Sequence, residues 1–259
     1  MSAAPVAPER PAWWVRLDWY HPEWTLGVVT VLAWAILVLA HGATSSGVVP
    51  VDGMPAMPGM DHGDAAASTA PTVSAWATGV GLWLVMAAAM MLPSLRTAMR
   101  TTSLTSRWNR RHRAAWLLAA GYLTVWAIPG LAVVTVLSVV PWTPPVWVTG
   151  VLLLVAAAWV ATPVRRDSLA ACHRTRRVPG QGRRADAACA REGVRLGLAC
   201  VGTCWLIMLA ATLATHDVLL MAVLTVVVVA EKVVEDRRRR LPAWTAGTLV
   251  VLAFGVFFL

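Results

Sequence analysis

Charged residues are scarce in this chain: Asp, Glu, Lys and Arg make up 14% of its 259 residues, and only 13 of these residues are acidic. Hydrophobic residues make up 58%, and the mean hydropathy is +0.64. This composition is too apolar for an ordinary soluble domain and indicates a polytopic membrane protein. The net charge of +9 does not indicate nucleic-acid binding, because the arginines lie between apolar segments, where basic loops set membrane orientation.

Cysteines are also few, and their positions predict no disulfide framework. Cys172 and Cys189 lie in an arginine-rich segment expected in the cytoplasm, whereas Cys200 and Cys204 lie inside an apolar run. The pair Cys172-His173 is a poor zinc motif, because Cys189 is distant and no second paired motif follows. The sequence contains nothing that resembles a nucleophile with its base, a phosphate loop or a carboxylate pair, so an enzyme is the least supported class.

Seven apolar segments of membrane-spanning character follow one another along the chain. They are residues 25–41, 76–95, 114–140, 146–164, 193–214, 218–234 and 241–259. Lys and Arg number two in the N-terminal tail and six, eight and five in alternate loops, with none in the other three. The positive-inside bias therefore predicts seven helices with the N-terminus cytoplasmic and the C-terminus outside. An all-α membrane bundle follows, because a helix satisfies its own backbone in lipid.

The segments between and before these helices divide the chain further. Residues 1–24 form a cytoplasmic tail with interfacial aromatics, and residues 25–41 are interpreted as a retained first helix rather than a signal peptide. Residues 42–75 form an extracytoplasmic loop, residues 76–236 the core bundle, and residues 237–259 a basic hinge with the last helix.

The most distinctive apolar run is the fifth segment, where Cys200, Cys204 and Met208 recur at intervals of four. On an α-helix these side chains share one stripe. Thiol and thioether sulfurs are soft ligands suited to Cu(I). Cysteines at i and i+4 on a regular helix do not converge for a disulfide, so both thiols are expected to be reduced.

The second segment carries a matching pair of methionines. Met86 lies roughly 15 Å from the outer start of its helix, and Cys204 roughly 16 Å from the cytoplasmic start of its own, at ~1.5 Å per residue. Met90 and Cys200 each lie one turn closer to the cytoplasm than Met86 and Cys204. The two stripes therefore form a four-sulfur ladder if the two helices are neighbours. Packing is the competing interpretation. Cysteine and methionine are common packing residues in apolar cores, and nearby glycines allow membrane helices to approach closely.

The extracytoplasmic loop contains a second, more accessible candidate. Met54, Met57, Met60 and His62 lie within a segment that has no Lys or Arg. Methionines at intervals of three with an adjacent histidine predict capture of Cu(I), or of Cu(II) through His62. The alternative is an unstructured loop that merely tolerates methionine.

Three polar residues near helix ends complete the candidates. The pair His216-Asp217 either adds harder metal ligands or caps a helix, and a capping role is favoured for Asp217. Glu231 is either a functional intramembrane carboxylate or an interfacial charge paired with Lys232, and the second interpretation is favoured.

These residues give the chain a family resemblance. Residues 88–93 (Ala-Ala-Met-Met-Leu-Pro), residues 197–208, Met221 and the pair Glu231-Lys232 resemble a bacterial family of predicted metal-binding integral membrane proteins of unknown function. The resemblance covers about residues 76–236. The chain departs from the family pattern at Thr203, where a second adjacent cysteine is expected, and at Arg176, where a cytoplasmic cysteine is expected.

The favoured function is therefore an integral protein of the bacterial cytoplasmic membrane that binds a soft metal ion, most simply copper. The outer loop captures the ion, and the intramembrane sulfurs hold it or pass it on to a copper-dependent protein. The alternative is a non-catalytic structural or assembly subunit of a larger membrane complex, with the lipid bilayer as its surroundings and arginine-rich loops that contact partners or anionic lipid.

Overall fold

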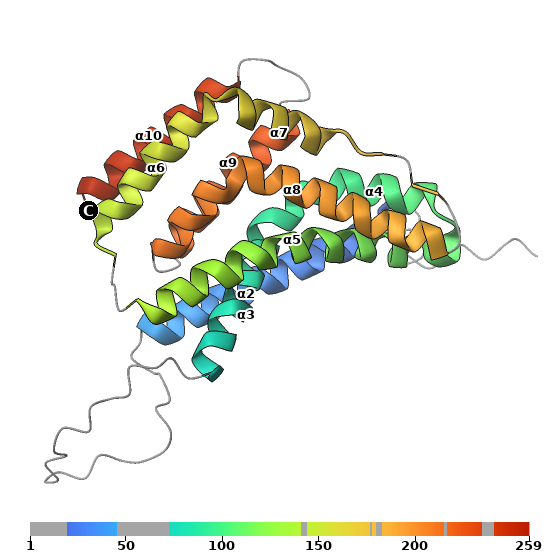
Figure 1. Ribbon diagram of the computed structural model, residues 1–259, viewed down its shortest axis with the longest axis horizontal. Helices are drawn as coiled ribbons and strands as arrows, with labels where there is room; N and C mark the ends of the chain where they lie inside the picture. Colours follow the sequence, from blue (N-terminus) through green and yellow to red (C-terminus); the bar gives the residue numbers. More distant parts are fainter. Residues whose placement is uncertain are drawn as a thin grey trace, which may run out of the picture.

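A computed structural model describes residues 20–45, 73–140, 144–176, 178–179, 183–214, 217–234 and 241–258. Within these ranges the regular secondary structure is helical, which confirms the all-α prediction. The α-helices are α2 (Trp24–Ser45), α3 (Val73–Met91), α4 (Arg96–Thr105), α5 (Arg111–Val139), α6 (Val146–Val160), α7 (Pro163–His173), α8 (Arg183–Leu213), α9 (Val218–Val234) and α10 (Leu241–Phe258) (Figure 1). Two short 3₁₀ helices, η1 (Leu92–Leu95) and η2 (Trp108–Arg110), join them.

Each of the seven apolar segments coincides with a helix, but seven membrane spans are not established. Four helices are long and apolar enough to cross a membrane, and a fifth span results if α6 and α7, bent by 76°, are counted as one. Helix α9 has 17 residues, and the apolar part of α10, Trp244–Phe258, is also shorter than a full span. The described residues therefore show a helical bundle with four or five helices of membrane-spanning length and composition.

The basic segments predicted as loops contain helices instead. Helix α4 and helix η2 occupy much of residues 96–113, and α7 with the first turns of α8 occupies much of residues 165–192. Helix α7 begins with Pro163 after Thr162, whose side chain accepts a hydrogen bond from the backbone N–H of Arg165. These are ordinary helix-start features, and a search for apolar spans does not register them. The outer-loop boundaries move as well, since α2 continues to Ser45 and α3 begins at Val73.

Helices α5 and α8 pack most closely in the bundle, and glycines make this possible. A Cβ atom added to Gly193 would lie 2.0 Å from the carbonyl oxygen of Leu118, and one added to Gly121 would lie 2.2 Å from that of Ala190. Neither position has room for a side chain, so the two backbones meet directly, as small residues allow in membrane helix pairs. The close pair fixes the face that α8 turns toward the core. Helices α5 and α8 run parallel, whereas α6 and α10 form an antiparallel pair at the other side of the molecule (Figure 1).

The outer surface of the bundle carries many large apolar side chains. Examples are Val31, Leu39, Ile128, Val139, Leu198, Val226, Val251 and Phe258, each between 61% and 86% exposed. They lie on α2, α5, α8, α9 and α10 rather than in one patch. Helices that are apolar on their outward face as well as on the packed face are typical of membrane-spanning segments.

Candidate soft-metal site

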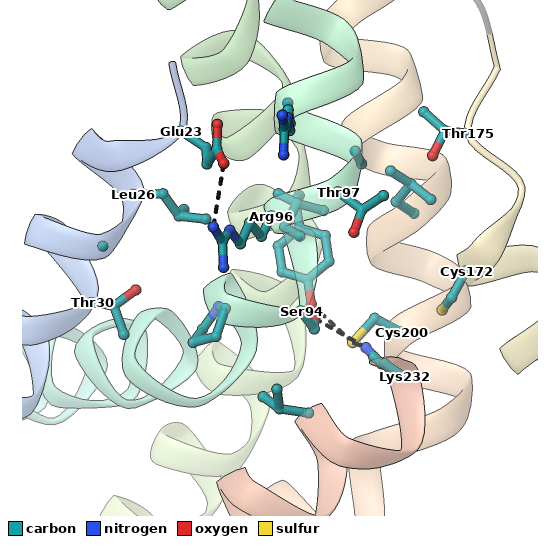
Figure 2. A pocket seen from close by; sticks show the side chains of 18 of the residues that line it. Glu23, Leu26, Thr30, Ser94, Arg96, Thr97, Cys172, Thr175, Cys200 and Lys232 are labelled. Atoms are coloured by element: carbon teal, nitrogen blue, oxygen red, sulfur yellow. Dashed lines mark hydrogen bonds and ion pairs between the residues drawn. The ribbon is translucent and has the colours of Figure 1, made fainter. Parts of the chain in front are cut away.

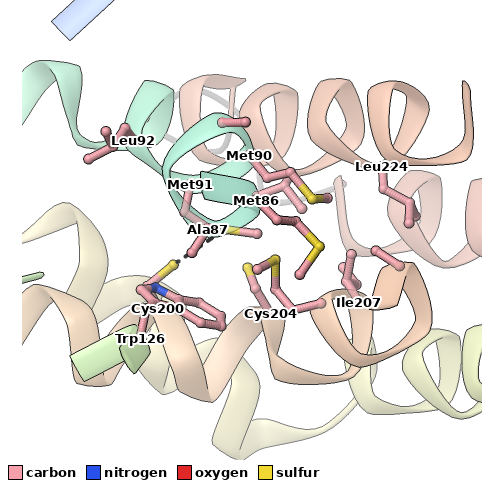
Figure 3. Close-up of a cluster of buried hydrophobic side chains, with 14 of the residues drawn as sticks. Met86, Ala87, Met90, Met91, Leu92, Trp126, Cys200, Cys204, Ile207 and Leu224 are labelled. Atoms are coloured by element: carbon pink, nitrogen blue, oxygen red, sulfur yellow. Dashed lines mark hydrogen bonds between the residues drawn. The ribbon is translucent and has the colours of Figure 1, made fainter. Parts of the chain in front are cut away.

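The predicted stripe on α8 faces the interior of the bundle. Cys200 and Cys204 are each 1% exposed, and Met208 is fully buried. The side chains follow the four-residue spacing and are inside the core with the methionines of α3 (Figure 3). All four cysteines of the chain are free thiols, as the spacing predicts for Cys200 and Cys204.

Side chains of α3 reach this stripe. The Met91 Sδ atom lies 3.9 Å from the Cys200 Sγ atom, and the Thr212 hydroxyl on α8 donates to the Met86 Sδ atom over 4.0 Å. Met86, Met90 and Met91 are all fully buried. Figure 3 shows Met86 and Met91 on the α3 side of a space whose α8 side carries Cys200 and Cys204. The two helices therefore turn their sulfurs toward each other, with Met91 as the methionine that contacts Cys200, a role that had been expected of Met90.

Polar groups from two other helices contact the Cys200 sulfur. The Tyr122 hydroxyl on α5 donates to Cys200 Sγ over 2.9 Å, and the Lys232 ammonium on α9 does so over 2.9 Å as well. Lys232 also contacts the Ser94 hydroxyl on η1 at 3.2 Å. The neighbouring thiol, Cys204, lies 3.2 Å from the Thr203 hydroxyl. Cys200 Sγ thus accepts two hydrogen bonds, one of them from a cation, and charge-assisted bonds of this kind fix the position of the side chain.

A buried ion pair lies beside these thiols. The Arg165 guanidinium, 1% exposed, binds the Glu231 carboxylate, 3% exposed, through two bonds of 2.6 and 2.5 Å. Arg165 also donates from Nε to the carbonyl oxygen of Thr203, at 3.3 Å. The interpretation of Glu231 as an interfacial charge paired with Lys232 is thus wrong, because Glu231 binds α7 and Lys232 turns to Cys200. This pair joins α7, α8 and α9 at the level of the cysteines.

A cavity of about 1130 Å³ opens next to Cys200 (Figure 2). Its wall includes Cys172, Cys200, Tyr122 and Lys232. Cys172, which the sequence analysis set aside as a poor zinc ligand, therefore shares a cavity with the main candidate thiol.

The remaining predicted residues have separate outcomes. Asp217 caps α9 as expected, because its carboxylate accepts from the backbone N–H of Leu220 at 2.9 Å. The outer-loop candidates Met54, Met57, Met60 and His62, and also His216, lie outside the described residues. In the described parts of the chain, no three His, Cys, Asp or Glu side chains are grouped closely enough to hold a metal ion.

Tyr122, Ser94, Lys232 and Arg165 were not predicted as part of the site. Each lies on a different element from Cys200, and spacing along a chain identifies a helix face but not the helix that faces it. A basic residue at the end of an apolar helix, such as Lys232, was the one available hint, because a charge at that depth needs a partner.

Fold and site together define an apolar helical protein with a buried cluster of thiol and thioether groups. A family model described as PpoB2, copper chaperone, matches residues 80–257, and the chain belongs to this family. The match includes most of α3, all of α4 to α9 and, beyond the range of the resemblance found in the sequence, most of α10. Neither the curated proteins nor the solved structures contain a significant match.

Proposed function

We propose that this protein is an integral membrane copper chaperone whose Cys200 and Cys204 thiolates hold Cu(I) with thioether sulfur from α3. The observation that carries the proposal is the contact between the Cys200 sulfur of α8 and the Met91 sulfur of α3, which lie 3.9 Å apart. Thiolate and thioether are the ligand types that favour Cu(I) over harder ions. Family membership, through a model described as a copper chaperone, supports the same cargo.

The roles of the individual sulfurs follow from their positions. Cys200 and Cys204 are the primary ligands, and Met91 is the thioether that contacts the Cys200 sulfur in the structure. Met86, Met90 and Met208 line the same buried region and provide alternative thioethers along it. Several weak sites in sequence suit a protein that must release its ion as well as bind it.

The outer loop is proposed as the capture site. Met54, Met57, Met60 and His62 provide soft ligands in a stretch of low charge, on the side predicted to be extracytoplasmic. From there copper passes to the sulfur cluster and then to a copper-dependent protein in or at the bacterial cytoplasmic membrane.

The test is the copper content of full-length protein purified in detergent and reconstituted with Cu(I). Wild type is compared with Cys200→Ser/Cys204→Ser, with a deletion of residues 53–63, and with Cys189→Ser. Cys189 is a matched control, because it is a fully buried thiol on the same helix α8.

The proposal predicts copper in the wild type and the Cys189 variant, and loss of the intramembrane fraction in the double variant. The loop deletion should lower copper content without abolishing it. If wild type and all variants bind no copper, the protein does not bind it, and its role is that of a structural or assembly subunit. Equal copper in every variant would overturn the assignment of the ligands.

A further inference from the structure

The cavity beside Cys200 is far larger than a metal ion requires. Its volume is about 1130 Å³, whereas one water molecule occupies roughly 30 Å³ in the liquid. Cavities that bind small organic molecules are typically about 300–1,000 Å³. The space next to the candidate thiol is therefore sized for a molecule that accompanies the ion.

The cavity wall has a distinct charge pattern. Arg96, Arg100 and Lys232 line it, and the Arg96 side chain, which is labelled in Figure 2, is 65% exposed. The single carboxylate in the described lining is Glu23, which is 4% exposed. Three cations against one anion favour an anionic occupant.

Glu23 provides a second indication of a ligand. Its Oε1 atom accepts from Arg96 at 3.4 Å and lies 3.5 Å from His21 Nδ1. Its Oε2 atom is buried and has no hydrogen-bond partner among the described residues. A buried carboxylate oxygen without a donor is costly, so such atoms commonly mark the place of a missing partner. A ligand amine or amide N–H would satisfy it.

We infer that this cavity admits Cu(I) bound to a small anionic thiol that also carries an amino or amide group. This inference rests on the proposed function. It identifies the chemical form in which copper reaches or leaves the protein at this end of the bundle. The ligand carboxylates lie against Arg96 and Arg100, its N–H group donates to Glu23, and its sulfur reaches Cys200. Cys172, on the same wall, is within the space that the thiol occupies.

Transfer in this cavity is a ligand exchange without oxidation or reduction. The Cys200 sulfur forms a bond to copper, and the bond between copper and the small thiol's sulfur breaks. Copper remains Cu(I) throughout. A proton leaving the Cys200 thiol is taken up by the departing thiolate, so the small thiol is released neutral at sulfur, and the reverse exchange unloads the protein.

The experiment compares the rate at which detergent-purified, full-length protein takes up Cu(I) from two donors. One donor is the Cu(I) complex of reduced glutathione, which has two carboxylates and an ammonium group; the other is the complex of 2-mercaptoethanol, which has neither. Uptake is followed as the amount of copper that stays with the protein after rapid gel filtration at successive times. The variant is Arg96→Gln/Arg100→Gln, and the charge-matched control is Arg107→Gln/Arg184→Gln, two exposed arginines that do not line the cavity.

Wild type and control should load faster from the glutathione complex than from the mercaptoethanol complex. In Arg96→Gln/Arg100→Gln the glutathione rate should fall about five- to tenfold, the loss expected for two partly exposed ion pairs. The mercaptoethanol rate should stay within about twofold. Equal rates from the two donors in wild type, or the same fall in variant and control, would overturn the inference.

Equilibrium copper binding separates this inference from the proposed function. Copper competition measurements should give Arg96→Gln/Arg100→Gln the wild-type affinity, because neither arginine contacts a sulfur ligand. A wild type that retains copper but shows no donor preference disproves the small-thiol cavity alone. A wild type that retains no copper disproves both.

Discussion

At the scale of single residues, the proposed site depends on sulfurs whose neighbours are already arranged around them. Cys200 accepts hydrogen bonds from Tyr122 and Lys232 and contacts Met91, so three other elements position one thiol. Loss of a group that orients a metal ligand typically lowers metal affinity about 10- to 100-fold. This arrangement supports the proposed copper site, in which the ligand sulfur is held by its neighbours before the ion binds.

Met91→Leu tests the thioether directly. Leucine conserves volume, so the fold should lose less than about 1.5 kcal/mol, while the sulfur is removed. Cu(I) affinity should fall about tenfold or more, the loss typical when support for a metal site is removed. Met99→Leu is the control, because Met99 is also fully buried but lies on α4. Equal affinities in the two variants, measured by copper competition, would remove Met91 from the site.

Glu231→Gln tests the buried ion pair. It leaves the Arg165 guanidinium, 1% exposed, without its bidentate partner, and breaking such a pair typically costs about 3–5 kcal/mol. Thermal unfolding in detergent should show a large loss of stability. Replacing both members by apolar residues, Arg165→Met with Glu231→Leu, should restore much of it.

The contrasting control for that pair is Arg113→Gln, which breaks the contact of Arg113 with Asp186. The Arg113 side chain is 68% exposed, so the expected loss is below about 1 kcal/mol. Similar losses in Glu231→Gln and Arg113→Gln would show that the Arg165–Glu231 pair is not desolvated as the structure describes.

Prediction of individual residues from the sequence succeeded for features that depend on one helix alone. The four-residue spacing places Cys200, Cys204 and Met208 on one face, and a polar residue before α9 predicts the Asp217 cap. It failed for Glu231, whose partner Arg165 comes from 66 residues away. No local pattern contains that information, because the bend between α6 and α7 is what brings Arg165 inward.

At the scale of elements, the contact between α5 and α8 determines which face of α8 enters the core. Gly121 and Gly193 let the backbones approach, and Gly197 sits against Tyr122 and Val125 one turn closer to Cys200. The glycines of α8 were predicted to serve close packing, and this is confirmed for Gly193 and Gly197. The identity of the partner helix was not predictable, since α5 and α8 are separated by two other helices along the chain.

Gly193→Val tests this packing. The added side chain would collide with the Leu118 carbonyl, so α5 and α8 must separate, and overpacking of this kind typically costs about 1–3 kcal/mol or more. Thermal stability in detergent should fall, and copper binding should weaken because Tyr122 moves away from Cys200. Gly247→Ala on α10 is the control: nothing lies within 4 Å of the added carbon, and the helix gains up to about 1 kcal/mol in propensity. A stable Gly193→Val variant would contradict the close α5–α8 contact.

Helices α4 and α7 are examples of secondary structure that hydropathy alone does not predict. Each contains two arginines and lies largely in a segment predicted as a loop, yet each buries a narrow face, which includes Met99 on α4 and Leu169 on α7. An amphipathic helix packed against the end of a bundle has low mean hydropathy. Its period, rather than its composition, is the feature to look for.

At the scale of the whole molecule, the segments predicted on the cytoplasmic side lie together. Glu23 before α2 contacts Arg96, Lys232 at the end of α9 contacts Ser94, and Arg195 on α8 contacts the carbonyl of Ala171 on α7. Charge counting alone assigned all of these regions to one side. Their contacts agree with that arrangement, while the number of spans and the direction of insertion stay predictions.

Reporter fusions test the predicted direction of insertion. A reporter active only outside the cytoplasm should be active when fused after Leu259 and inactive when fused within residues 178–182. A reporter active only in the cytoplasm should show the reverse. Activity of the same reporter at both positions would contradict an odd number of spans between them, and therefore the seven-helix topology.

X-ray absorption at the copper edge of full-length protein loaded with one equivalent of Cu(I) tests the central claim most directly. We predict a first shell of sulfur in wild type and in Cys189→Ser, and loss of tightly held copper or replacement of sulfur by lighter atoms in Cys200→Ser/Cys204→Ser. A shell made only of nitrogen or oxygen in wild type, or a sulfur shell that the double variant leaves unchanged, would contradict it.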